Sequence, residues 1–426
     1  MTTSDLDLEA PERLAATFAS IDRMDTKSQP VQQMPLFRAA PRDHALTRGR
    51  QLRTAGLFSG IGGLELGLRR AGHTSEILCE NEPGAGAVLR HRFPDIPLHE
   101  DVRDLEHLPA GIELLVGGFP CQDLSQAGLT AGIRGARSGL VDEAFRLLRT
   151  HDVPWVLLEN VPFMLQLDRG RALDHIVTAL EELGYRWAYR VVDSRSTGLP
   201  QRRERVYLLA SKDGDPRDVL LVDDAGVPET PPIEEWRDVA CGFYWTEGLR
   251  GLGWAHDAVP TLKAGSTIGI PSPPAIVLTS GEIVKPDLRD AERLQGFEAD
   301  WTQPAEEVGR PSHRWKLVGN AVTVDVAEWL GQRLREPGHY EPKGDPVLHR
   351  KGSWPKAAWG IDGERHVAHR SAWPQHAQRT PLEEFLRYDP TPLSFKAAAG
   401  FFSRAQRAKL RFPPGFLDLV EQHLDR

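Results

Sequence analysis

One cysteine stands where the chain could carry out nucleophilic chemistry. Cys121 follows Pro120 in the run Gly-Gly-Phe-Pro-Cys-Gln, directly after the apolar residues 114–116. A buried parallel strand that ends in a sharp turn presents the next side chains to the ligand crevice of its sheet. A thiolate held there among polar groups is a nucleophile. On this segment alone an inert thiol is the alternative, because cysteine is often a small core residue.

Carboxylates are expected at the ends of neighbouring strands. Glu80 follows the strand expected at residues 76–79, where a carboxylate can bind the ribose hydroxyls of a nucleoside. Asp101 lies further on, placed to accept a hydrogen bond from an adenine amine. Glu159 ends an apolar run, and a partly desolvated Glu has a raised pKa and can act as an acid near neutral pH. For Glu80 and Asp101, a solvated loop carboxylate is the alternative.

Glycines and arginines complete the set of candidate residues. The run Leu-Phe-Ser-Gly-Ile-Gly-Gly at 57–63 lies between an expected strand and helix, where glycines allow close approach of a ligand and the helix start offers free N–H groups. Its spacing is not that of a dinucleotide site, and a structural turn is the alternative. Downstream, Arg203 and Arg205 lead into an apolar strand and are expected on one side of it. Residues 319–322 precede a helix and can close the crevice.

The elements that must position these groups alternate along the chain. We expect strands at 54–58, 76–79, 114–116, 156–158, 186–192 and 206–210, and helices at 62–71, 83–91, 139–150, 173–183, 287–294 and 324–335. This alternation predicts an α/β fold with a doubly wound mixed sheet and helices on both faces. The expected division is an N-terminal extension (1–50, with a short helix about 8–22), a catalytic domain (51–211), a small loop-rich recognition region (212–285), a return to the catalytic domain (286–335) and a C-terminal extension (336–426).

Composition narrows the class of protein. The chain has 426 residues, a net charge of −8 and three cysteines, which argues against a disulfide framework and a cysteine-rich zinc site. No apolar stretch is long enough to span a membrane, and the first residues lack a signal peptide's pattern. We therefore expect a cytoplasmic, nucleoid-associated protein. The net negative charge does not indicate a polyanion as the partner. It does not exclude one either, if basic residues line a cleft.

Six motifs, in this order, resemble those of the bacterial DNA (cytosine-5)-methyltransferase family. They are Phe58-x-Gly60-x-Gly62-Gly63, Gly118-Phe119-Pro120-Cys121-Gln122, Glu159-Asn160-Val161, Gln201-x-Arg203-x-Arg205, Arg293-Leu294-Gln295-Gly296-Phe297 and Gly319-Asn320-Ala321-Val322. Each is short, but six in order are specific, and they span about residues 51–335. The resemblance implies the fold of S-adenosylmethionine-dependent methyltransferases.

The resemblance also implies a mechanism. The Cys121 thiolate adds to carbon 6 of a cytosine, Glu159 protonates or hydrogen-bonds ring nitrogen 3 and the exocyclic amine, and Arg205, with Arg203, contacts the base oxygen and the loop around Cys121. S-adenosylmethionine supplies the methyl group for carbon 5, and no metal is required. Because a stacked base is out of reach, the cytosine must be flipped out of the duplex.

Binding residues are implied in the same way. For the cofactor they are Phe58, Gly60, Gly62, Gly63, Glu80, Asn81, Asp101, Asn320 and Val322. For DNA they are Gln122, Ser125, Arg137, Gln201, Arg250, Lys263 and Ser266. The last three are weak candidates within Gly242–Ile270, where we place base reading because the preceding residues are strongly acidic and acidic side chains repel phosphate.

Two other functions remain open at this level. One is a cytosine-5 methyltransferase acting on transfer RNA, although the recognition interval and the Gly-Phe-Pro-Cys motif favour duplex DNA. The other is a catalytically silent DNA-binding subunit, which would need neither Cys121 nor Glu159. The expected setting is a restriction–modification or defence system, with a monomeric enzyme and a cognate endonuclease or defence protein as partner. The C-terminal residues are expected either to pack on the catalytic domain or to contact DNA.

Overall fold

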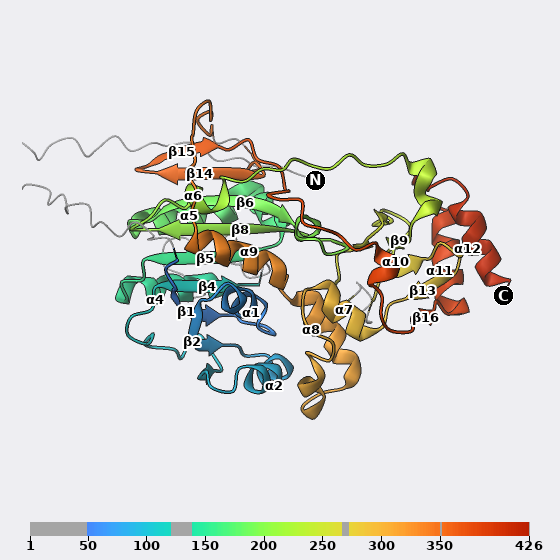
Figure 1. Ribbon diagram of the computed structural model, residues 1–426, viewed down its shortest axis with the longest axis horizontal. Coiled ribbons are helices and arrows are strands. Elements are labelled where there is room, and N and C mark those ends of the chain that lie inside the picture. The colour runs from blue at the N-terminus through green and yellow to red at the C-terminus, as the bar shows by residue number, and fades with distance from the viewer. Residues whose placement is uncertain (1–48, 121–138, 266–271, 350–351, 426) are drawn as a thin grey trace, which may run out of the picture. The chain divides into compact units, whose positions relative to one another are not determined.

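A nine-stranded mixed sheet forms the centre of the computed structural model, which describes residues 49–120, 139–265, 272–349 and 352–425 (Figure 1). Its strands run in the order β15-β14-β6-β8-β5-β4-β1-β2-β3. They are β1 (Arg53–Leu57), β2 (Thr74–Cys79), β3 (Leu98–His99), β4 (Leu114–Gly118), β5 (Trp155–Asn160), β6 (Arg186–Asp193), β8 (Glu204–Ser211), β14 (Ala357–Ile361) and β15 (Glu364–Val367).

The direction of these strands creates the crevice that a ligand needs. The strands β3, β2, β1, β4 and β5 are parallel, and β8 runs antiparallel between β5 and β6. The chain order reverses between β1 and β4, which is where a doubly wound sheet opens a crevice beyond its carboxyl ends. Strands β4 and β5 are buried almost throughout, as expected of strands covered on both faces.

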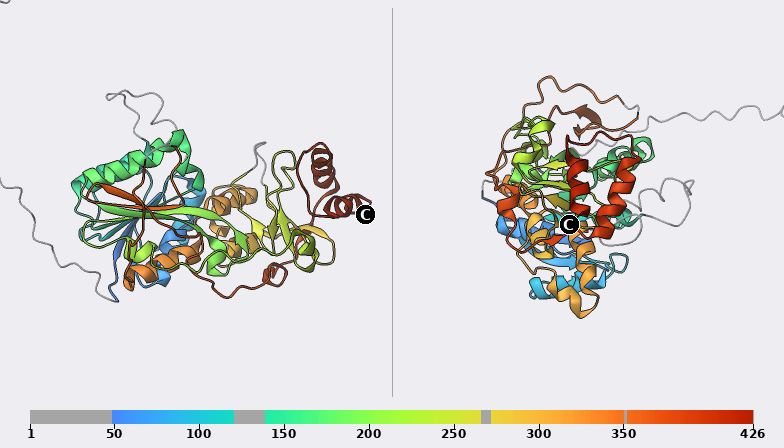
Figure 2. Two further views of the ribbon diagram at one scale, coloured as in Figure 1. Left: turned by 90° about the horizontal axis from the view of Figure 1, so that it is seen from above. Right: turned by 90° about the vertical axis from the view of Figure 1, so that its right-hand side faces the viewer.

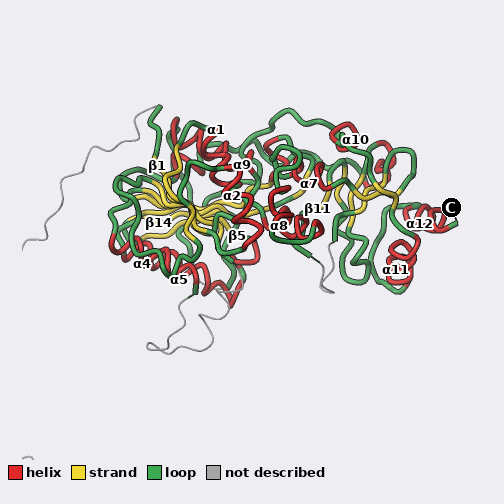
Figure 3. The backbone as a smooth tube through the Cα atoms, turned by 90° about the horizontal axis from the view of Figure 1, so that it is seen from below, coloured by secondary structure: helices red, strands yellow, loops and turns green. Residues whose placement is uncertain are grey.

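Helices cover both faces of this sheet (Figure 3). On one face lie α1 (Gly63–Arg70), α9 (Val324–Arg335) and the short α6 (Arg217–Leu220), and their apolar side chains share a core with β4 and β5. The other face carries α4 (Leu140–Thr150) and α5 (Arg171–Glu182). Near the β3 edge, α2 (Pro83–Arg92) packs with residues 297–324, which include α8 (Arg314–Asn320).

A second, antiparallel sheet has its own core (Figure 2). Its strand order is β10-β9-β12-β13-β16, with bounds Ala255–His256, Cys241–Phe243, Ala275–Val277, Ile283–Lys285 and Thr391–Pro392. Helices α11 (Phe395–Gln406) and α12 (Phe416–Leu424) pack against it, and the Phe243 ring lies 5.1 Å from the rings of both Phe401 and Phe416. The remaining described strands and α-helices are β7 (Gln201–Arg202), its partner β11 (Val259–Pro260), α7 (Leu288–Leu294) and α10 (Leu382–Phe385).

The expected strands and helices of the central sheet are confirmed to within a few residues. Residues 336–426, expected as an extension, supply β14 and β15 to the first sheet and β16, α11 and α12 to the second. Helix α6, which falls within the interval expected for recognition, shares a core with the central sheet. Residues 1–48, including the helix expected at about 8–22, lie outside the described residues. Within the described ranges, no helix combines the length and the apolar character that a membrane span requires.

Candidate active site

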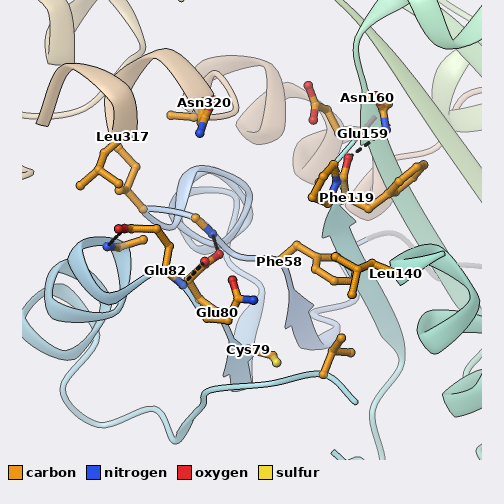
Figure 4. A pocket seen from close by; sticks show the side chains of 18 of the residues that line it. Phe58, Cys79, Glu80, Glu82, Phe119, Leu140, Glu159, Asn160, Leu317 and Asn320 are labelled. Atoms are coloured by element: carbon orange, nitrogen blue, oxygen red, sulfur yellow. Dashed lines mark hydrogen bonds between the residues drawn. The ribbon is translucent and has the colours of Figure 1, made fainter. Parts of the chain in front are cut away.

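A cavity of about 320 Å³ lies at the carboxyl ends of β1, β2, β4 and β5, at the point where the strand order reverses (Figure 4). Side chains from β8 and α8 complete its walls. The volume is within the range of pockets that hold small ligands. Glu80 and Glu159 lie at opposite ends, and the Phe58 side chain lies between them.

The Glu80 end of the cavity is built by a turn of unusual backbone conformation. Phe58 and Gly60 both have a φ of 55°, a left-handed conformation that is uncommon for a phenylalanine and often marks functional sites. The Gly60 N–H donates to Glu80 Oε2 (2.7 Å) and the Glu82 N–H to Oε1 (2.8 Å). Burial raises the pKa of Glu80, and the backbone N–H groups oppose that effect. Each carboxylate oxygen keeps capacity to accept a further hydrogen bond from a ligand hydroxyl.

The Glu159 end holds a buried acid beside a guanidinium. Arg205 Nε lies 3.0 Å from Glu159 Oε1, and about a tenth of either side chain is exposed. Burial raises the pKa of Glu159, while the charges of Arg205 and Arg203 lower it in part. The carboxyl therefore holds a proton at a higher pH than an exposed Glu does, which is a property of acid catalysts.

Asn160 fixes the segment that leads to the cysteine. Its side-chain amide donates to the Phe119 carbonyl (2.9 Å), and its carbonyl oxygen accepts from the Val161 N–H (2.8 Å). Both Phe119 and Pro120 line the cavity. The backbone entering residue 121 is thus held at the Glu159 end.

Gly118 keeps space open between the two ends. A Cβ at this position would lie 3.2 Å from Glu159 Oε2 and 3.5 Å from Val322 Cγ2. Any larger residue would narrow the cavity beside Glu159. An open cavity at this point accounts for a glycine in a buried strand, where glycine otherwise weakens the strand.

Eight of the residues expected at the site line this one cavity. They are Phe58, Gly60, Glu80, Asn81, Asp101, Glu159, Arg205 and Asn320. Asp101 also pairs with Arg103 (2.5 Å), whose hydrogen bonds lower the pKa of that carboxyl to about 2. Five expected residues, namely Cys121, Gln122, Ser125, Arg137 and Ser266, lie outside the described residues.

Two residues expected to contact the substrate have side chains that are buried and bonded to the protein backbone. Arg203, expected at the base, is 1% exposed and donates to the carbonyls of Leu262, Gly319 and Ala321. Gln201, expected at DNA, is fully buried; its amide donates to the Leu294 carbonyl and its oxygen accepts from the Leu262 N–H. Both side chains fix the backbone just before β8: Arg203 ties it to the segment that carries Asn320, and Gln201 ties it to the end of α7 and to Leu262.

Three further residues expected at the cofactor are packed behind the residues that line the cavity. Gly62, Gly63 and Val322 are not among the lining residues. A Cβ on Gly62 would lie 2.5 Å from the Phe93 ring, and one on Gly63 would lie 2.3 Å from the Val322 carbonyl oxygen. These glycines therefore allow close packing of α1 against its neighbours.

The two remaining described candidates for DNA contact lie between β9 and β12. Arg250 is exposed. The Lys263 ammonium pairs with Glu247 and lies 3.6 Å from the centre of the Tyr244 ring. Their role at DNA stays a prediction.

Sequence reasoning missed a buried polar network behind the site. Gln295 Oε1 accepts from the Thr323 hydroxyl and from the Gln201 amide (3.1 Å each), and the Gln295 amide donates to the Val318 carbonyl (2.8 Å). The Ser194 hydroxyl lies 2.9 Å from that of Thr323. The motif at 293–297 was the one sequence signal for this network, because the residues that Gln295 contacts are far apart in the sequence. Leu317 and Glu82 also line the cavity and were not singled out.

The described cysteines are poor nucleophiles. Burial raises the pKa of Cys79 to about 12 and that of Cys241 to about 11, and neither is in a disulfide. A thiol with such a pKa holds almost no thiolate near neutral pH. The described part of the chain also has no cluster of three or more His, Cys, Asp or Glu side chains that could hold a metal ion.

Known proteins resemble this chain over most of its length. Residues 52–239 match the model of the family described as C-5 cytosine-specific DNA methylase. The Type II methyltransferase M2.BsuMI of Bacillus subtilis (strain 168) is 45% identical over 387 residues, which cover 88% of this chain and 99% of that protein. The Type II methyltransferase M.NgoBI of Neisseria gonorrhoeae is 30% identical and covers 70% of this chain and 98% of its own length. The crystal structure of S. pombe Dnmt2 methyltransferase superposes with a TM-score of 0.49 at 17% identity, over 67% of this chain and 98% of that one.

Proposed function

The chain belongs to the C-5 cytosine-specific DNA methylases, and on that basis we propose that it methylates carbon 5 of a flipped-out cytosine in duplex DNA through a covalent bond to Cys121. It is a DNA cytosine-5 methyltransferase of the restriction–modification type. One observation carries the mechanistic part of the proposal. The buried Glu159–Arg205 pair shares a single cavity with Pro120, the residue before Cys121, and with the Glu80 turn.

The cavity suits S-adenosylmethionine. Glu80 would accept from the ribose hydroxyls, the Phe58–Gly60 turn would surround the methionine part, and Asn81 and Asp101 would lie toward the adenine. The space that Gly118 leaves open beside Glu159 fits a ligand running from one end to the other. When bound, S-adenosylmethionine supplies the methyl group that carbon 5 accepts.

The protein's part is to make carbon 5 a nucleophile. The Cys121 sulfur forms a bond to carbon 6, and electron density moves toward ring nitrogen 3, where the proton held by Glu159 stabilises it. Arg205 orients the Glu159 carboxyl. After the methyl group is in place, carbon 5 loses its proton and the carbon 6–sulfur bond breaks, which regenerates the thiolate.

Burial and position both favour Cys121 as the nucleophile. Of the three cysteines, Cys79 and Cys241 are buried with strongly raised pKa values. Cys121 directly follows a residue of the cavity wall. Because the cavity lies inside the protein, the target base must leave the helix to reach it, at a cost of a few kcal/mol.

A methyl-transfer assay separates this proposal from its two rivals. Radiolabelled S-adenosylmethionine is incubated with the full chain and either unmethylated duplex DNA or unmodified transfer RNA. We expect label on carbon 5 of cytosine in the duplex. Label on transfer RNA alone would favour the RNA enzyme, and cofactor-dependent DNA binding without any label would favour a silent subunit.

A further inference from the structure

A second hollow adjoins the active-site cavity and differs from it in charge. Its volume is about 510 Å³, and Glu82 lines both. Its walls come from the start of α2 at Gly84, from Gly265, and from Arg310, His313 and Lys316 at and before α8. The volume exceeds the lower limit of small-ligand pockets, about 300 Å³.

The two cations of this hollow are available to a ligand. Arg310 and Lys316 are exposed, and no carboxylate in the ranges that the structure describes lies within ion-pair distance of either. Glu82, the one acidic residue in the lining, is already engaged: it accepts from the Ala85 N–H (2.6 Å) and lies 2.8 Å from His313 Nε2. The hollow therefore attracts anions.

Its position is set by close packing of residues 262–264 on α8. Gly319 in α8 lies so near the 263–264 peptide that a Cβ there would be 2.2 Å from the Lys263 carbonyl carbon. Arg203 strengthens this junction, because it donates to the carbonyls of both Leu262 and Gly319. The hollow thus lies beside the segment where base reading is predicted and beside the wall of the active-site cavity.

We propose that Arg310 and Lys316 bind a backbone phosphate of the substrate DNA beside the segment where base reading is predicted. The inference rests on the proposed function, because it takes duplex DNA as the ligand. A guanidinium pairs with two phosphate oxygens and an ammonium acts as a point charge, so the two side chains together suit a phosphodiester. Contacts to phosphate fix the register of a protein on DNA and carry no sequence information.

Equilibrium binding over a range of salt concentrations tests this role. The probes are a duplex with a site that the wild-type enzyme methylates and a duplex without one, and the variant is Arg310→Ala/Lys316→Ala. We expect the slope of log K against log salt to become shallower by about 1 to 2, and affinity to fall to a similar extent for both duplexes. Lys343→Ala, at a side chain that is 88% exposed, is the matched control and should leave the slope unchanged.

Three results would overturn the inference while leaving the proposed function intact. The first is a double variant with the wild-type slope. The second is weakened binding of S-adenosylmethionine by calorimetry, which would assign the hollow to the cofactor. The third is weakened binding of inorganic phosphate with DNA binding unchanged, which would make it a site for a free anion. Failure of the wild-type protein to bind or methylate any duplex would instead refute the proposed function.

Discussion

Replacement of Glu65 by glutamine tests how burial raises the pKa of a carboxyl group behind the Phe58–Gly60 turn. Glu65 is 1% exposed and lies in the first turn of α1. Its carboxylate packs against the Gly56 backbone, because a Cβ added to Gly56 would lie 2.2 Å from Glu65 Oε1. The Ser59 hydroxyl lies beside the same point. No cation pairs with it among residues 49–120, 139–265, 272–349 and 352–425.

The expected magnitude follows from the pKa. Burial, with a smaller effect of the Glu80 charge, raises the pKa of Glu65 from 4.5 to about 7. In the unfolded chain the carboxyl keeps its ordinary pKa, so between these two values the folded protein holds a proton that the unfolded chain has released. Stability then falls as the pH rises through this window. At about 1.4 kcal/mol for each pKa unit, the loss is about 3 kcal/mol.

Urea unfolding at two pH values measures this effect. The glutamine side chain has a similar shape and no charge, so we expect the free energy of unfolding of Glu65→Gln to exceed that of the wild type by about 3 kcal/mol at about pH 8.5, and by about 1 kcal/mol or less at about pH 5. Glu364→Gln, at an 81% exposed side chain, is the control and should follow the wild type at both pH values. If the difference between Glu65→Gln and the wild type did not change with pH, the reasoning from burial would be refuted.

Three substitutions test the other roles assigned to the site. Glu159→Gln should keep S-adenosylmethionine binding by calorimetry but lower the methylation rate by about 100-fold or more, because an amide can donate a hydrogen bond to ring nitrogen 3 but cannot transfer a proton to it; an unchanged rate would remove Glu159 from the mechanism. Gly118→Ala should weaken S-adenosylmethionine binding about tenfold, since its Cβ would lie 3.2 Å from Glu159 Oε2, and wild-type affinity would show that no ligand passes there. Arg203→Met should lower the free energy of unfolding by about 3 kcal/mol, because three buried carbonyls lose their donor; unchanged stability with lost activity would restore Arg203 as a residue that contacts the base.

The sequence predicts the central sheet because its signals are local. Apolar runs such as 114–116 mark buried strands, and glycine turns mark the ends of β1 and β4. The site residues at these strand ends are predicted for the same reason: the carboxyl ends of parallel strands share one edge, so Glu80 and Glu159 meet at one cavity.

Long-range pairing explains what was missed. Strand β14 pairs with β6, more than 150 residues earlier in the chain, and the strands of the second sheet are too short to show a period. The buried hydrogen bonds of Arg203 could not be predicted for a related reason. An arginine near an active site suggests ligand contact, but its acceptors at 262, 319 and 321 become neighbours only in the folded chain.

The account depends most on Cys121 attacking a cytosine in the cavity that holds Glu159. The direct measurement uses duplex DNA in which 5-fluorocytosine replaces cytosine, because fluorine at carbon 5 blocks the final elimination and keeps the protein–DNA bond. After incubation with S-adenosylmethionine, the protein is digested and its peptides are analysed by mass spectrometry. We predict a nucleotide adduct on Cys121 and none on Cys79 or Cys241. The absence of any adduct, or an adduct on another residue, would contradict the account.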